Sequence, residues 1–155
     1  MPEPSKGSPT TEVQLQRDPD AANSAASRRT RGSRFERIVA AVTGAVFLAA
    51  GLWAFLAPVS FFEAAATFEP YNVHLVRDIG AFQIGIGTVL VLAVLSRDAL
   101  LSALAGASTG ATFHLISHLI DHDLGGSPVV DIPVFGLTAV LLVAAALSRT
   151  TALRR

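Results

Sequence analysis

Residues 38–57 read IVAAVTGAVFLAAGLWAFLA, a stretch without a single charged side chain. At 1.5 Å of rise per residue, a helix of this length spans the hydrocarbon core of a bilayer, which is about 30 Å thick. Three further apolar runs follow at residues 79–96, 99–120 and 132–148. None of the four runs has the charged face that a helix on the surface of a water-soluble bundle shows. The sequence therefore predicts an all-α fold, a four-helix transmembrane bundle.

The composition of the whole chain supports this interpretation. Its 155 residues are 51% hydrophobic. Only 15% are charged, whereas typical soluble domains are about 25% charged. Twelve Lys and Arg balance twelve Asp and Glu, so the chain lacks the strongly basic character of a nucleic-acid-binding protein. The absence of cysteine excludes disulfides, thiolate metal sites and cysteine nucleophiles.

The chain divides into three parts. Residues 1–34 are polar, rich in Pro, Ser, Thr and Ala, and are expected to form a disordered cytoplasmic tail. The four-helix domain occupies residues 35–148, and a basic C-terminus follows at 149–155. Arginines precede the first run and follow the last, whereas the two loops at the other end hold Arg77 as their only Lys or Arg. By the positive-inside rule, both termini are expected in the cytoplasm, with the bundle in the plasma membrane.

A regular series of glycines and histidines begins in the third apolar run and ends just after it. Its members, at intervals of four residues, are Gly106, Gly110, His114, His118 and His122. Residues four apart share one face of a helix, and a glycine pair at this spacing lets a neighbouring helix approach closely. Gly85 and Gly87 in the second run are also expected to serve close helix packing.

The histidines of this series lie at the outer end of the expected bundle, close to other polar residues. Antiparallel packing would bring Gln83 level with His114. The expected cluster at the outer mouth contains His74, Arg77, Asp78, Gln83, His114, His118, Asp121, His122 and Asp131. Because a guanidinium near the membrane boundary needs an acidic partner, Arg77 is expected to pair with Asp121 or Asp131.

Three roles for this cluster stay open. Its side chains can hydrogen-bond across the bundle and fix helix packing. They can form a proton site or a site for a small polar ligand, as ionisable groups in membrane segments often do. They can also bind a metal such as zinc, or haem, although no cofactor is predicted under the first two roles. The candidate ligands are His114, His118, Asp121, His122 and His74.

Sequence motifs of the common enzyme classes are missing. The chain contains no P-loop, no GxSxG and no HExxH, and its Gly85-Ile86-Gly87 lies inside an apolar run rather than at a strand–helix turn. We therefore favour a non-enzymatic role and predict no catalytic residues.

Two stretches carry a family resemblance. Residues 72–83, NVHLVRDIGAFQ, followed by Gly85 and Gly87, and residues 114–126, HLISHLIDHDLGG, resemble uncharacterised actinobacterial four-helix membrane proteins similar to the DoxX-like group. The resemblance covers about residues 38–148. It implies a four-helix integral membrane fold and, for some members, association with redox partners. It supplies no catalytic residues.

These features together predict a small multi-pass integral membrane protein that serves as an accessory or interaction subunit of a membrane assembly. Its expected partners are the lipid bilayer and either other membrane proteins or further copies of itself, and not nucleic acid. The alternative is a membrane redox protein that binds a metal or haem through His114 and His118.

Overall fold

The computed structural model describes residues 34–96 and 99–154, and every regular element in these two ranges is a helix. The helices are α2 (Arg34–Leu56), α3 (Pro58–Ala65), α4 (Val73–Leu95), α5 (Leu100–Ile120) and α6 (Pro128–Arg154). All except the short α3 are long and apolar enough to cross a membrane. The expected all-α class and the four helices of membrane-spanning length are confirmed, and they are compatible with a small multi-pass membrane protein.

Two helices begin earlier than their apolar runs. α4 begins at Val73 rather than at 79, because the Asn72 side chain caps it and accepts hydrogen bonds from the backbone N–H groups of His74 (3.0 Å) and Leu75 (3.2 Å). α6 begins at Pro128 rather than at 132, with proline at a position where the helix needs no N–H donor.

Only part of the two predicted terminal segments lies within the described residues. α6 continues to Arg154, so the expected basic C-terminus is helical over residues 149–154. Arg34 already belongs to α2, and the rest of the expected tail, residues 1–33, lies outside the described residues.

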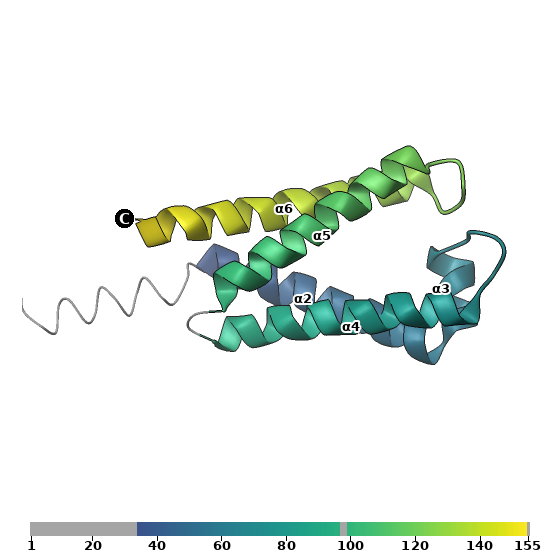
Figure 1. Cartoon of the computed structure of the whole chain (residues 1–155), viewed down its shortest axis with the longest axis horizontal. Coiled ribbons are helices and arrows are strands. Elements are labelled where there is room, and N and C mark those ends of the chain that lie inside the picture. Colours follow the sequence, from purple (N-terminus) through teal and green to yellow (C-terminus); the bar gives the residue numbers. More distant parts are fainter. Residues whose placement is uncertain (1–33, 97–98, 155) are drawn as a thin grey trace, which may run out of the picture.

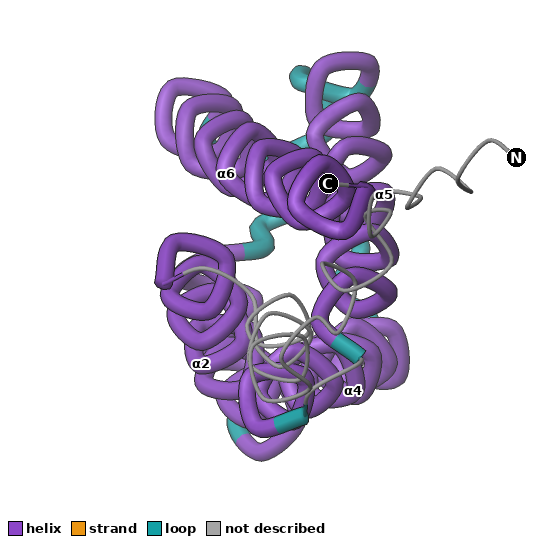
Figure 2. The backbone as a smooth tube through the Cα atoms, turned by 90° about the vertical axis from the view of Figure 1, so that its left-hand side faces the viewer, coloured by secondary structure: helices purple, strands orange, loops and turns teal. Residues whose placement is uncertain are grey.

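The four long helices form two antiparallel hairpins, α2 with α4 and α5 with α6 (Figures 1 and 2). Contacts between the two hairpins are sparser than contacts within them. α2 begins, α4 ends, α5 begins and α6 ends at one end of the molecule, which we call the termini end (Figure 1). The short α3 and the loop between α5 and α6 lie at the opposite end, which we call the α3 end (Figure 1).

Glycines bring the backbones of α2 and α4 into direct contact. A Cβ atom placed on Gly44 would lie 3.0 Å from the carbonyl oxygen of Gly87, and one on Gly51 would lie 2.7 Å from that of Gly80. The two contacts are seven residues, or two helical turns, apart in both helices. Among the predicted packing glycines, Gly87 therefore lies in the tightest helix contact, whereas a Cβ on Gly85 would meet no atom within 4 Å.

A core of small and branched apolar residues joins all four long helices. Its buried members are Val39, Ala40, Leu90, Ala93, Leu100, Ala103, Leu104, Ala107, Ala111, Ala139, Leu142 and Ala145. On α5 the buried face includes Ala103, Ala107 and Ala111, four residues apart. Gly106 and Gly110 lie off this face, and a Cβ on either would meet no atom within 4 Å. The expected glycine ridge therefore does not pack against any other helix in the described part of the chain.

At the termini end, a buried polar contact links the two hairpins. Glu36 of α2 is fully buried, and its Oε1 accepts a hydrogen bond of 2.9 Å from the Ser148 hydroxyl of α6. The neighbouring Arg149 is also buried. Arg149 was expected only as part of the basic cytoplasmic C-terminus, and no role was predicted for Glu36. Their burial follows from the packing of α2 against α6, which the sequence pattern does not reveal.

Candidate functional site

A pocket of about 520 Å³ lies at the α3 end, between the two hairpins. Its volume falls within the range of about 300–1,000 Å³ that is usual for small-molecule sites. Aromatic walls come from Phe61 of α3, Phe68 of the following segment and Phe135 of α6. The polar side chains of the lining are Glu69, Gln83, His114, Ser117, His118 and Asp121. The pocket thus combines an apolar interior with a few polar groups, as ligand sites commonly do.

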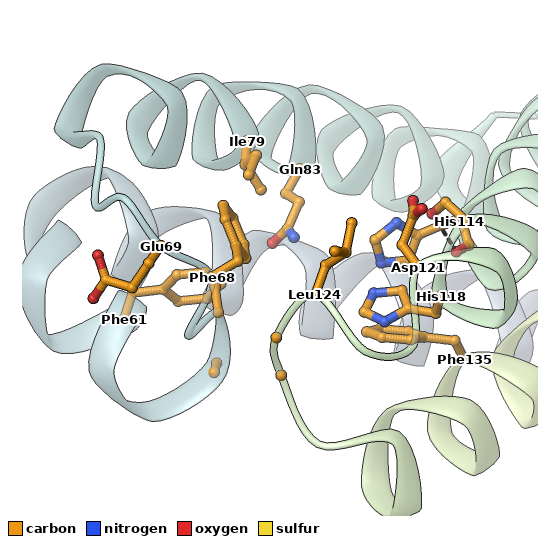
Figure 3. Close-up of a pocket in the computed structure, with 15 residues that line it drawn as sticks. Phe61, Phe68, Glu69, Ile79, Gln83, His114, His118, Asp121, Leu124 and Phe135 are labelled. Carbon is orange, nitrogen blue, oxygen red and sulfur yellow. Dashed lines mark hydrogen bonds between the residues drawn. The ribbon is translucent and has the colours of Figure 1, made fainter.

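The last turns of α5 and the second turn of α6 build one side of this pocket. The imidazoles of His114 and His118 lie one helical turn apart, with ring centroids separated by 4.8 Å. The Phe135 ring lies 4.5 Å from each of them. Figure 3 shows these three rings on one side of the pocket and Phe61 and Phe68 on the other. Ring contacts of this kind are favourable, so the histidines form a packed unit with Phe135.

Gln83 of α4 extends into the space between these two sides (Figure 3). Its Oε1 atom is buried and has no hydrogen-bond partner among residues 34–96 and 99–154. A buried acceptor without a donor costs about 1–3 kcal/mol in stability. Gln83 therefore presents an acceptor that a donor group in the pocket would satisfy.

The loop between α5 and α6 closes the α3 end and connects the hairpins. The Gly126 N–H donates to the Thr67 hydroxyl at 3.3 Å. A Cβ on Gly125 would lie 2.5 Å from the Thr67 carbonyl oxygen, and both glycines have a positive φ. At the start of α6, the Asp131 carboxylate accepts a hydrogen bond of 2.7 Å from the Ser127 N–H. The loop therefore needs glycine both for its backbone shape and for its contact with Thr67.

The structure brings together only part of the polar cluster that the sequence suggested. Gln83, His114, His118 and Asp121 line the pocket. The remaining members, which do not line it, are His74, Arg77, Asp78, His122 and Asp131.

The ion pairs at this end also differ from the expectation. His74 Nε2 lies 3.4 Å from Asp78 Oδ2, one helical turn along α4. Arg77 is exposed and, among the described residues, forms no ion pair with Asp121 or Asp131. The expected pairing of Arg77 was therefore wrong. The Asp131 carboxylate instead accepts a hydrogen bond from the Ser127 N–H.

The metal hypothesis requires three or four ligands around one point. Over residues 34–96 and 99–154, no group of three or more His, Asp or Glu side chains is placed to hold a metal ion. His114 and His118 are close together, but His74 and His122 lie outside the pocket. The described residues thus do not assemble the five-residue ligand set suggested for zinc, and no observation points to haem.

The aromatic side of the pocket, formed by Phe61 and Phe68, was not predicted from the sequence. Phe61 and Phe68 reach the pocket because α3 folds back on α2 and α4 through the buried residues Ala54, Phe61, Phe62 and Val76. The spacing of Gly44 from Gly51 and of Gly80 from Gly87, seven residues in both helices, was a signal for the α2–α4 contact that could have been found.

Comparisons of the chain with protein-family models, curated proteins and solved structures found no match. The fold and the pocket themselves define its class: a small helical protein with four candidate membrane spans and a ligand-sized pocket at one end of the bundle.

Proposed function

We propose that this chain is a multi-pass protein of the plasma membrane that serves as an accessory or interaction subunit of a larger membrane assembly. The observation that carries the proposal is a glycine pair on α5 that contacts no other helix in the described part of the chain. Gly106 and Gly110 are exposed, lie one turn apart, and have open space where a side chain would be. The tight glycine contacts between α2 and α4, in contrast, are formed within the chain.

The exposed glycines are more informative than the many exposed Leu, Val and Phe side chains of the bundle. Lipid tails solvate large apolar side chains as well as a protein does, so those side chains need no protein partner. Close backbone approach, in contrast, is a main source of attraction between helices in a membrane, and small residues permit it. The α5 face therefore suits a transmembrane helix from another subunit.

The family resemblance supports the same role. Residues 72–83 and 114–126 resemble uncharacterised four-helix membrane proteins that are similar to the DoxX-like group, and for some members of that group the resemblance implies association with redox partners. No specific observation favours the alternative role as a metal- or haem-binding redox protein, because the described residues do not assemble a ligand set.

The test is co-purification from native membranes in a mild detergent. A Gly106→Leu/Gly110→Leu variant is compared with wild type and with Gly85→Leu, whose glycine is exposed on α4 in equally open space. We expect a defined membrane protein to co-purify with wild type and with Gly85→Leu but not with the double variant. Two differently tagged copies of the chain, co-expressed, distinguish a second copy from a different subunit. A wild-type chain that purifies alone as a monomer would contradict the proposal.

A further inference from the structure

The electrostatic character of the pocket at the α3 end limits what it can bind. Its lining contains two carboxylates, Asp121 and Glu69, and no Lys or Arg. Glu69 is partly engaged, because its Oε2 accepts a hydrogen bond of 3.0 Å from the Tyr71 N–H. The Asp121 side chain forms no hydrogen bond or ion pair with any described residue. Both carboxylates are exposed, and among the lining residues only His114 and His118 could offset their charge, each by taking up a proton. The lining therefore favours a cation over an anion.

The second polar feature is an acceptor. Gln83 Oε1 is buried without a partner and extends between the two sides of the pocket (Figure 3). A donor group that binds here would remove the cost of this unpaired acceptor. A ligand with N–H groups could therefore donate hydrogen bonds to both Gln83 and Asp121.

The third feature is the set of aromatic rings. Phe61 and Phe68 stand on one side of the pocket and Phe135 on the other, as Figure 3 shows. These rings give both sides of the pocket an apolar surface. The same rings supply the apolar contact that the rest of such a ligand needs.

We propose that this pocket binds a small amphipathic organic cation, a protonated amine that carries an apolar group. The ammonium N–H groups donate to the Asp121 carboxylate and to Gln83 Oε1, and the apolar group lies among Phe61, Phe68 and Phe135. The amine is either a free molecule or the headgroup of an aminophospholipid, since both present the same ammonium chemistry.

The experiment measures binding of three probes with one carbon skeleton to the full chain in a mild detergent. The probes are 4-phenylbutylamine, the neutral 4-phenylbutanol and the anionic 4-phenylbutyrate, titrated calorimetrically with a micelle blank. We expect saturable binding of one amine per chain. The alcohol should bind at least about tenfold more weakly, because it lacks the charge-assisted hydrogen bonds, and the carboxylate should not bind saturably. Equal affinity for amine and alcohol, tighter binding of the carboxylate, or no saturable binding of the amine would overturn the proposal.

Variants then assign the site. Asp121→Asn removes the charge and should weaken amine binding at least about tenfold, and Gln83→Leu should weaken it by a similar factor. Asp123→Asn is the matched control, because Asp123 is an exposed carboxylate of the same loop that does not line the pocket. Unchanged affinity in Asp121→Asn, or an equal loss in Asp123→Asn, would overturn the assignment. If a pocket variant does not fold, the probe series on the wild-type chain decides alone.

The source of the amine is tested in lipid nanodiscs. Discs of phosphatidylcholine alone are compared with discs that also contain phosphatidylethanolamine, whose headgroup carries an ammonium with N–H donors. Loss of probe affinity only in the second set would identify the lipid headgroup as the ligand. Equal probe affinity in both sets would exclude the phosphatidylethanolamine headgroup as the ligand and leave a free amine as the source. Both results support the pocket as an ammonium site.

Discussion

Gly51 of α2 and Gly80 of α4 face each other with their backbones in contact. A Cβ on Gly51 would lie 2.7 Å from the carbonyl oxygen of Gly80, and a Cβ on Gly80 would lie 2.8 Å from that of Gly51. Gly44 and Gly87 repeat this reciprocal contact two turns away. The obstructing atoms are backbone atoms of a helix and not the ends of flexible side chains. Neither helix can therefore accept a methyl group here without moving away from the other.

We expect Gly80→Ala to lower the free energy of unfolding by about 1–3 kcal/mol, as overpacking of a well-packed contact typically does. Gly85→Ala is the control on the same helix, because its Cβ would enter open space. That change should be neutral or slightly stabilising, since Ala is a better helix former than Gly. Thermal unfolding in detergent measures both variants. Equal midpoints for the two would show that the α2–α4 contact is looser than described.

The Glu36–Ser148 hydrogen bond should contribute to stability at the termini end. Ser148→Ala removes a donor to a fully buried carboxylate, and hydrogen bonds to charged groups contribute about 1.5–3 kcal/mol. Thr151→Ala, on the same helix, removes an exposed hydroxyl that bonds only a carbonyl of its own helix. We expect unfolding in detergent to show a clear loss of stability for Ser148→Ala and little change for Thr151→Ala. A loss of the same size in both variants would contradict a specific role of the Glu36 contact.

The metal content of the purified protein tests the histidine pair. We expect protein made without a histidine tag to contain no stoichiometric zinc, iron or copper, because His114 and His118 lack the further ligands that zinc requires. Elemental analysis and the visible spectrum measure this directly. Stoichiometric metal that disappears in a His114→Gln/His118→Gln variant would restore the metal hypothesis.

The orientation in the membrane can be tested by single-cysteine labelling, because the chain has no cysteine of its own. Ser127 lies exposed in the loop at the α3 end, and Thr151 lies exposed near the end of α6. By the positive-inside rule, a cysteine at Ser127 should react with an impermeant reagent in intact cells. A cysteine at Thr151 should react only after the membrane is opened. The reverse pattern would invert the orientation and place the pocket on the cytoplasmic side.

The number of long helices, and the fact that each is long enough to cross a bilayer, could be predicted from the sequence, because both depend on local properties. An uninterrupted apolar run of the right length predicts a span whatever it packs against, and each of the four runs is helical. The sequence also placed Gln83 and His114 on different helices at similar depth, and both line the same pocket. Helix starts were less well predicted, because polar caps such as Asn72 extend a helix beyond its apolar run.

Which faces of the helices meet could not be predicted from the sequence. A membrane helix is apolar all round, since lipid and protein neighbours are equally apolar, so its hydropathy does not mark the buried side. For this reason the sequence pointed to Gly106 and Gly110, whereas the backbone contact within the chain uses Gly51 and Gly80. The pocket likewise depends on segments far apart in the sequence. Phe61 and Phe135 reach it only because α3 folds back and the two hairpins meet at that end, and no local pattern specifies that meeting.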